Sequence, residues 1–161
     1  MAKDKTEKTN VMRILDQKKV PYGSYSYADT DAISGVEVAS ALGQDPAAVF
    51  KTLVTTGRTG EHYVFMIPVA EELDLKKAAS AAGEKAIEML KSKELLPLTG
   101  YVHGGCSPIG MKKQLVTVIH TSASELPKII FSAGKIGYQV ELAPADLAKV
   151  IRYTFADVIV E

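Results

Sequence analysis

Apolar residues recur at helical spacing in several segments of this 161-residue sequence. After Thr9 or Asn10, either of which can cap a helix, Val11, Ile14 and Leu15 share one face. In later segments a capping residue precedes an apolar face, and a glycine or proline marks a helix boundary. The pattern therefore predicts helices that begin near Thr9, Ser34, Asp74 and Pro144, and a shorter helix near Leu95.

Other segments alternate in polarity or are rich in β-branched residues, as strands are. Residues 49–56 and 62–69 flank a turn at residues 57–60 and predict a hairpin. The remaining strand candidates are residues 22–27, 115–120, 129–132, 138–142 and 156–160, with a short strand near Ile87. Strands and helices do not alternate strictly, so we expect no doubly wound fold. We expect an α+β domain in which a mixed, curled, barrel-like β-sheet of about six or seven strands is surrounded by three or four helices.

The length and composition are those of a single soluble domain. We expect residues 1–161 to form one domain, with residues 1–9 as a solvated N-terminal arm. Apolar residues make up 47% of the chain and charged residues 24%, close to the averages for globular proteins. No apolar run approaches the roughly 20 residues of a membrane span, and no apolar signal core follows the charged N-terminus. We therefore expect a cytoplasmic protein that does not bind membranes.

The charge and the cysteine and histidine content exclude several kinds of site. Lysine and arginine together number 19, as do aspartate and glutamate, so the formal charge is zero. A neutral chain is not expected to coat long nucleic acids such as DNA, although a local basic pocket for one RNA end remains open. A disulfide framework is impossible with Cys106 as the single cysteine. The three histidines lack metal-ligand spacing, so we expect no metal and no other cofactor.

Two loops of small residues are candidates for binding an anion. Residues 104–113 read GGCSPIGMKK, and residues 132–137 read SAGKIG. Backbone amides in such loops can hold a phosphate or a developing oxyanion. The first loop is not a P-loop, because Met111 precedes Lys112 and Lys113 stands where Ser or Thr would bind magnesium. The two loops can converge on one ligand, or each can be a plain turn with surface lysines.

Lys51 and Cys106 are the two single residues that suggest chemistry. Lys51 lies in an apolar strand, on the same face as Leu53. Such a lysine either extends its ammonium to solvent or is held, partly desolvated, for a phosphate or carbonyl. Cys106 lies in a glycine loop, which can lower a thiol pKa. The sequence indicates no base beside it, so we interpret Cys106 as a bystander thiol.

Several motifs, in order and spacing, resemble the YbaK/EbsC family of bacterial Cys-tRNA(Pro) deacylases, relatives of the editing domain inserted in some prolyl-tRNA synthetases. The resemblance runs from about Val11 to the C-terminus. The motifs are VFKTL at 49–53, PVA at 68–70 with LDLKK at 73–77, TGY at 99–101, GGxSPxGxKK at 104–113 and SxGK at 132–135.

The resemblance implies a trans-editing aminoacyl-tRNA deacylase that removes cysteine from Cys-tRNA(Pro) without a metal or organic cofactor. The thiol of the substrate would attack its own ester carbonyl. The implied partners are the 3′ end of tRNA(Pro) and prolyl-tRNA synthetase. Because a neutral chain is expected to bind tRNA weakly on its own, specificity for tRNA(Pro) would come from a ternary complex with the synthetase. Lys51 and Gly105 match catalytic positions, and we hypothesise that Lys51 grips the terminal adenosine or its phosphate while amides near Gly105 stabilise the oxyanion. The matched substrate-binding positions are Tyr27, Thr52, Gly104, Ser107, Pro108, Gly110, Ser132, Gly134, Lys135 and Gln139.

Departures from the family pattern surround the implied pocket. Ala133, Ile136 and Gln139 replace a glycine, a basic residue and an aspartate that are common in the family, and Ser34 replaces an aromatic residue of some relatives. Cys106 stands where other members have an aliphatic residue, which argues against a nucleophilic role. These changes bear on selectivity for cysteine. The alternatives are an Ala-tRNA(Pro) deacylase and a non-catalytic module that binds a tRNA end or the synthetase.

Overall fold

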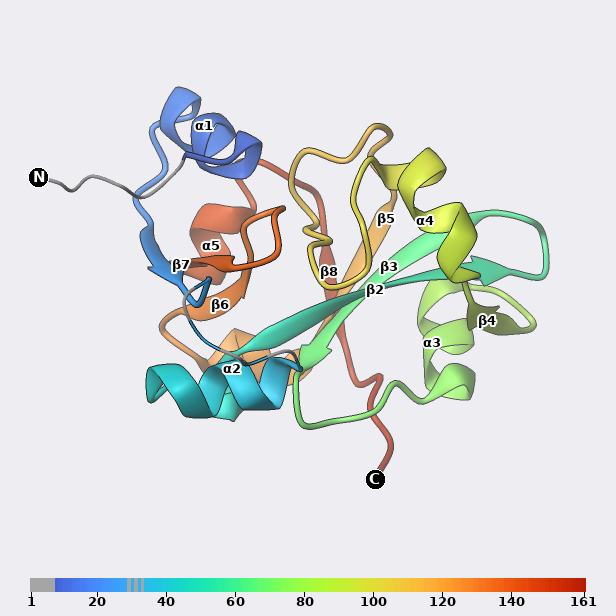
Figure 1. The fold of residues 1–161 in the computed structure, drawn as a ribbon. Helices are drawn as coiled ribbons and strands as arrows, with labels where there is room; N and C mark the ends of the chain where they lie inside the picture. Colours follow the sequence, from blue (N-terminus) through green and yellow to red (C-terminus); the bar gives the residue numbers. More distant parts are fainter. Residues whose placement is uncertain (1–7, 29, 31, 33) are drawn as a thin grey trace, which may run out of the picture.

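The computed structural model describes residues 8–28, 30, 32 and 34–161, and Figure 1 shows the course of the chain. Most of the predicted N-terminal arm, residues 1–7, lies outside the described residues. Its last residue, Thr9, is buried, and its side chain accepts a hydrogen bond from the amide of Met12. Thr9 therefore caps the first helix, as the sequence predicts.

All the predicted helices are present. Their bounds are α1 (Asn10–Gln17), α2 (Gly35–Leu42), α3 (Leu75–Ala82), α4 (Ser92–Thr99) and α5 (Pro144–Leu147), with short 3₁₀ helices η1 (Pro46–Ala48) and η2 (Thr121–Glu125). Ser34 and Glu37 form the predicted capping box of α2, because each side chain accepts a hydrogen bond from the other's backbone amide. The described residues thus hold five α-helices, one more than the upper predicted number.

Eight strands form two sheets in the described part of the chain, so the prediction of one barrel-like sheet is wrong. The strands are β1 (Gly23–Ser26), β2 (Phe50–Gly57), β3 (His62–Pro68), β4 (Ile87–Met89), β5 (Val116–His120), β6 (Ile129–Ser132), β7 (Tyr138–Leu142) and β8 (Thr154–Ala156). One sheet has the order β1-β7-β6 and is antiparallel, and the other has the order β4-β2-β3-β5-β8 and is mixed. A single parallel bridge, Val49 to Ile130, connects them. Beyond this pair, residues of β2 and β6 line a cavity instead of pairing, and the barrel does not close.

The larger sheet packs on both faces. On one face Tyr63, Phe65 and Ile67 of β3 form a core cluster with Ala78 and Ala79 of α3. On the other face, alternate residues of β2 and β3 join α1, α5 and the smaller sheet in the main core. Figure 1 shows the loop between α4 and β5 arching above the place where β2 and β3 run side by side. This loop carries the first glycine-rich segment.

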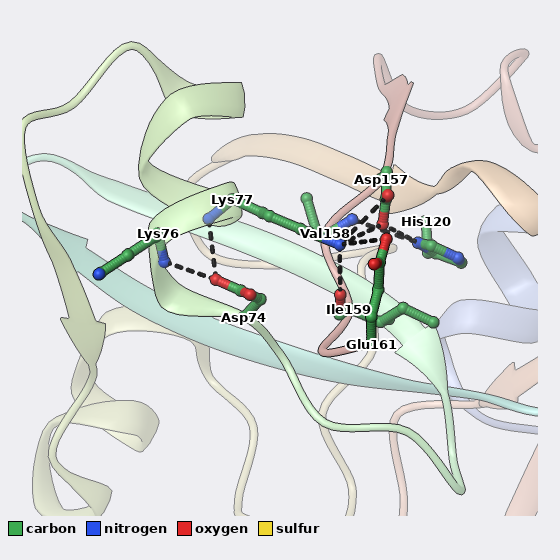
Figure 2. Close-up of polar contacts among 8 residues, drawn as sticks. All are labelled: Asp74, Lys76, Lys77, His120, Asp157, Val158, Ile159 and Glu161. Carbon is green, nitrogen blue, oxygen red and sulfur yellow. Dashed lines mark hydrogen bonds and ion pairs between the residues drawn. The ribbon is translucent and has the colours of Figure 1, made fainter.

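The last strand lies slightly earlier than predicted because the C-terminal residues pair elsewhere. β8 ends at Ala156, whereas the sequence pattern places it at residues 156–160. Lys77 of α3 donates to the carbonyl of Ile159 at 2.9 Å and pairs with the carboxylates of Asp157 and Glu161 at 3.2 Å (Figure 2). Together with the antiparallel bridge between Leu73 and Ile159, these contacts hold the C-terminal residues beside the start of α3.

Candidate active site

A cavity of about 460 Å³ lies between the two sheets. Its lining comes from β2, from the ends of β6 and β7, from α2 and α4, and from the loops next to these elements. The lining residues are Tyr27, Ser34, Gly35, Val38, Val49, Phe50, Lys51, Thr52, Leu53, Val54, Val69, Met89, Leu90, Ser92, Leu95, His103, Gly104, Cys106, Phe131, Ser132 and Gln139. Of the twelve residues that the sequence predicts for the site, Lys51, Tyr27, Thr52, Gly104, Ser132 and Gln139 come together here.

The central wall of the cavity is an open stretch of strand edge. β4 pairs with β2 only over Thr55–Gly57, and the bridge to β6 involves only Val49. The residues between them, 50–54, pair with β3 on one side and line the cavity. Since neighbouring side chains of a strand point to opposite faces, the lining residues of β2 belong to both of its faces.

Lys51 and Thr52 bring polar groups to this wall. The Lys51 side chain is half-buried, and its ammonium has no hydrogen-bond or ion-pair partner among the described residues. The hydroxyl oxygen of Thr52 is buried and likewise has no partner in the described part of the chain. Buried polar groups are nearly always hydrogen-bonded, so an unpartnered one beside a cavity indicates a group that a ligand can satisfy.

The two glycine-rich loops meet at the cavity. A Cβ atom at Gly105 would lie 3.1 Å from the amide nitrogen of Ile136, so the backbones of the loops are in close contact there. Gly104 and Cys106 of the first loop and Ser132 at the start of the second line the cavity. The amide of Gly105 itself donates to the carbonyl of Val102 at 2.9 Å. For the amides of Gly104 and Cys106 no acceptor exists among the described residues.

Gly105 and five other predicted site residues do not line the cavity. Gly110 and Gly134 have φ values of +80° and +88° and pack against the ring of Tyr101, where a Cβ atom would lie 2.8 Å from its hydroxyl or 3.0 Å from its Cε1 atom. Glycine is required at both positions by the backbone and by the close approach.

Ser107 and Pro108 are fully or largely buried inside the first loop. The Ser107 hydroxyl accepts a hydrogen bond from the amide of Ile109 at 3.4 Å. Lys135 is exposed, and its ammonium lies 5.6 Å from the ring centre of Tyr138. The structure therefore gives these residues contacts in and around the loops and not in the cavity wall.

Ser132 and Gln139 face each other across the β6–β7 ladder, in which they are paired. The Ser132 hydroxyl accepts a hydrogen bond from the amide of Gly134 at 3.1 Å, which fixes the turn that follows β6. The side-chain oxygen of Gln139 accepts from the side-chain amide of Gln44 at 2.8 Å. Both hydrogen bonds hold the β6–β7 hairpin. The turn of this hairpin is the second glycine-rich loop, which contacts the first. Of the departures from the family pattern, Ala133 is buried and Ile136 is 55% exposed.

Burial controls the ionisation of Cys106. The side chain is only 7% exposed, and desolvation raises the pKa of its thiol to about 12. The thiol is therefore neutral near pH 7, which is unsuitable for a nucleophile. Within the part of the chain that the structure describes, no group of three His, Cys, Asp or Glu side chains is arranged to hold a metal ion. No helix of that part is long and apolar enough to span a membrane.

The sequence did not point to several residues that line the cavity. His103, one of the three histidines without metal-ligand spacing, lines the cavity, and Leu90 and Ser92 come from the segment between the predicted strand near Ile87 and the predicted helix near Leu95. Gly35 at the start of α2 also lines the cavity, beside Ser34, which the departures from the family pattern had already placed around the pocket. These residues carry no chemical signal in the sequence, because they reach the site only through the packing of the two sheets.

The comparison with known proteins identifies the class. Residues 30–150 match the family model described as the aminoacyl-tRNA editing domain, which is most of the chain. The protein belongs to this family. A protein of Enterococcus faecalis named "Putative Cys-tRNA(Pro)/Cys-tRNA(Cys) deacylase EbsC" is 49% identical over 160 residues, which cover 98% of each chain. The resemblance predicted from the sequence motifs is thus confirmed.

Two further matches agree with this assignment. The proline–tRNA ligase of Pelobacter propionicus is 29% identical over 108 residues, which are 67% of this chain and 19% of the ligase. A crystal structure of "a putative trans-editing enzyme for prolyl tRNA synthetase" superposes with a TM-score of 0.82 at 22% identity, covering 95% of this chain and 99% of the other. At that identity, the second match supports the fold alone.

Proposed function

We propose that this protein is a trans-editing deacylase that removes cysteine from mischarged Cys-tRNA(Pro). The observation that carries the proposal is the cavity, where a half-buried lysine without a described partner, an open strand edge and two touching loops surround one space. The similarity to the E. faecalis protein, whose name contains this activity, supports it. The cavity would receive the 3′ end of tRNA(Pro), and prolyl-tRNA synthetase would supply further tRNA contacts in a ternary complex.

The reaction needs little chemistry from the protein. The substrate thiol attacks the carbonyl carbon of its own ester, a C–S bond forms and the ester C–O bond breaks. The thiol proton ends on the released ribose hydroxyl, which leaves a cyclic thiolactone and free tRNA. No protein nucleophile and no metal ion takes part. The protein holds the thiol near the carbonyl and stabilises the negative charge that develops on oxygen.

The residues have separate roles in this scheme. Lys51 holds the terminal adenosine or its phosphate, because the residue lines the cavity and its ammonium has no described partner. The first glycine loop offers the amides of Gly104 and Cys106 to the developing oxyanion, and Gly105 shapes the loop by its bond to Val102. Tyr27, Thr52, Ser132 and Gln139 complete the pocket around the aminoacyl group. The remaining predicted residues hold the loops in place.

An editing site of this kind is needed because a proline pocket cannot strongly reject a smaller amino acid. Differences of a methylene group are worth only about 1–3 kcal/mol in a binding pocket. The same argument applies to alanine, so an Ala-tRNA(Pro) deacylase is the nearest alternative. A thiol-assisted reaction distinguishes the two, since alanine has no thiol.

The test is a deacylation assay with the wild type, Lys51→Ala and a matched control. Labelled Cys-tRNA(Pro) and Ala-tRNA(Pro) are incubated with each protein, with and without EDTA. The control is Lys85→Ala, which removes an exposed lysine outside the cavity lining. We expect rapid loss of cysteine with the wild type and Lys85→Ala, and a decrease of about 100-fold in kcat/KM for Lys51→Ala. We expect no effect of EDTA.

Each other outcome assigns a different function or role. Faster hydrolysis of Ala-tRNA(Pro) would make the protein an alanine deacylase. Hydrolysis of neither substrate would leave a module that binds a tRNA end or the synthetase. Full activity of Lys51→Ala would remove the lysine from the mechanism, and inhibition by EDTA would overturn the metal-free scheme.

A further inference from the structure

The backbone of Thr52 is unpaired on the cavity side. Three hydrogen bonds fix the direction of the backbone groups along β2. The carbonyl of Val49 accepts from the amide of Val69, and the amide of Gly57 donates to Glu61, so odd-numbered residues point towards β3. The carbonyl of Val54 accepts from the amide of Leu90 on the β4 side, so even-numbered residues point away from β3.

This alternation leaves Thr52 with its amide and its carbonyl both directed to the open edge. Its neighbour in the ladder, Met66, lies on the side where these groups do not point. The ladders of β2 and the bridge at Val49 give Thr52 no partner on this side, and no loop residue of the described part of the chain bonds to its amide or carbonyl. Its hydroxyl is also without a described partner. Thr52 thus presents a backbone donor and acceptor that lie outside the ladders of β2, together with a hydroxyl that has no described partner.

An unpaired residue at a strand edge binds a group with the same pattern of donor and acceptor. In an antiparallel ladder, two opposed residues exchange both hydrogen bonds, N–H to C=O in each direction. An aminoacyl ester carries an ammonium and a carbonyl at the spacing of one residue of a strand. Extended peptides bind to open sheet edges in this way, with the main chain supplying affinity.

We propose that the aminoacyl group pairs with Thr52 as a single added strand residue. Its ammonium donates to the Thr52 carbonyl, and its ester carbonyl accepts from the Thr52 amide. This inference rests on the proposed function for the identity of the ligand. It adds a donor for the developing oxyanion that lies on a rigid strand, opposite the loop amides.

The pairing also fixes where the amino-acid side chain goes. Directly opposed residues in a ladder have their side chains on the same face. The substrate side chain would therefore lie on the face of Thr52, beside Phe50 and Val54. These two belong to the same core cluster as Cys106 and Phe131, which also line the cavity. Recognition of the α-amino acid is thus separate from selection of its side chain, which is left to this apolar region.

The test uses a ligand that the protein cannot hydrolyse. The probe is 3′-(L-cysteinylamino)-3′-deoxyadenosine, in which an amide replaces the ester, and its partner is the deamino analogue with a 3-mercaptopropionyl group. Binding to the full-length wild type is measured by calorimetry. We expect the deamino analogue to bind about 10- to 100-fold more weakly, the effect of losing a charge-assisted hydrogen bond. Affinities within twofold of each other would overturn the proposal.

Amide hydrogen exchange locates the contact. With saturating cysteinyl probe, exchange of the Thr52 amide should slow by tenfold or more, whereas the Val54 amide, on the same edge, should change less. Protection of Val54 without Thr52 would overturn the pairing as stated. These measurements need no catalysis, so a wild type that binds and protects in this way but cleaves no Cys-tRNA(Pro) would disprove the proposed function and leave this inference standing.

A substitution provides a second readout. Thr52→Pro removes the amide at an open edge, where proline is tolerated because no ladder bond is lost. Thr52→Val is the matched control, since it keeps both backbone groups and removes only the hydroxyl. We expect Thr52→Pro to bind the cysteinyl probe at least tenfold more weakly than Thr52→Val. Equal affinities with a native circular dichroism spectrum would contradict the proposal, and if Thr52→Pro does not fold, the probe pair and the exchange data decide.

Discussion

At the scale of single residues, Cys106 lies at the candidate site, but its thiol is not ionised at neutral pH. Cys106 is one of the lining residues, but burial raises the pKa of its thiol to about 12. The aliphatic residue expected at this position in relatives fits the same interpretation. Cys106 contributes to the apolar surface near Phe131, with which it shares a core cluster, and not to bond cleavage.

Replacement of Cys106 by alanine should therefore leave catalysis nearly unchanged. We expect kcat/KM for Cys-tRNA(Pro) to stay within about threefold of the wild type, because no bond to the thiolate is lost. The measurement is the initial rate of deacylation at pH 7.5, with Cys106→Ser as a polar control. A decrease of a hundredfold or more in both variants would make Cys106 the nucleophile.

Individual residues of the site differ in how far the sequence can predict them. Lys51 is conspicuous because an ammonium interrupts an apolar strand, and it does line the cavity. The family motifs brought Gly110 and Gly134 into the predicted site, but the structure places them against Tyr101. A motif records which residues a fold requires, and it does not separate residues that contact a ligand from residues that shape the loop.

At the scale of elements, helix caps and the hairpin could be predicted from the sequence, because the residues that form them lie close together along the chain. The capping box of α2 and the hairpin of β2 and β3 have the predicted positions. The division into two sheets was not predictable in this way, since it depends on the separation of β2 and β6 after the Val49–Ile130 bridge. That separation is a property of three-dimensional packing, and it creates the cavity.

The second glycine loop is an element whose packing can be tested apart from activity. A Cβ atom at Gly134 would lie 2.9 Å from Val11 of α1 and 3.0 Å from the ring of Tyr101, and its φ is +88°. Gly60 is the matched control, because its φ is +93° but no atom lies within 4 Å of the added Cβ. Both alanine variants carry backbone strain, and only one adds a clash.

We expect Gly134→Ala to destabilise the protein more than Gly60→Ala does. Backbone strain alone costs about 1–3 kcal/mol at such positions, and overpacking adds about 1–3 kcal/mol more at Gly134. Urea unfolding followed by circular dichroism measures both free energies. Equal losses of unfolding free energy would show that α1 can move away from the added methyl group at no energetic cost. The loop would then not depend on α1 for its position.

At the scale of the whole molecule, the C-terminal segment joins the sheet to α3. The amide of Val158 donates to Nδ1 of His120 at 3.3 Å, and Lys77 holds the residues on either side (Figure 2). To accept this hydrogen bond, Nδ1 of His120 must carry no proton. Local sequence patterns do not predict this contact, because its partners are 38 residues apart along the chain.

This contact predicts a dependence of global stability on pH. Burial lowers the pKa of His120, and Lys77 acts in the same direction, whereas Asp157 and Glu71 oppose them. An unfolded histidine has a pKa of about 6.5. Below that pH the unfolded chain binds a proton that the native state resists, so the stabilisation from His120 is present above about pH 6.5 and is lost as the pH falls through the lowered native pKa.

The free energy of unfolding in urea, measured at pH 7.5, 6.5 and 5.5, tests this prediction with His120→Asn. Asparagine keeps an acceptor that can reach the amide of Val158 but does not titrate. We expect the wild type to lose more stability than the variant between pH 7.5 and 5.5, because only the wild type must protonate a buried ring on unfolding. If both proteins lose the same amount, His120 does not control acid stability, and the loss must come from other groups that titrate in this range.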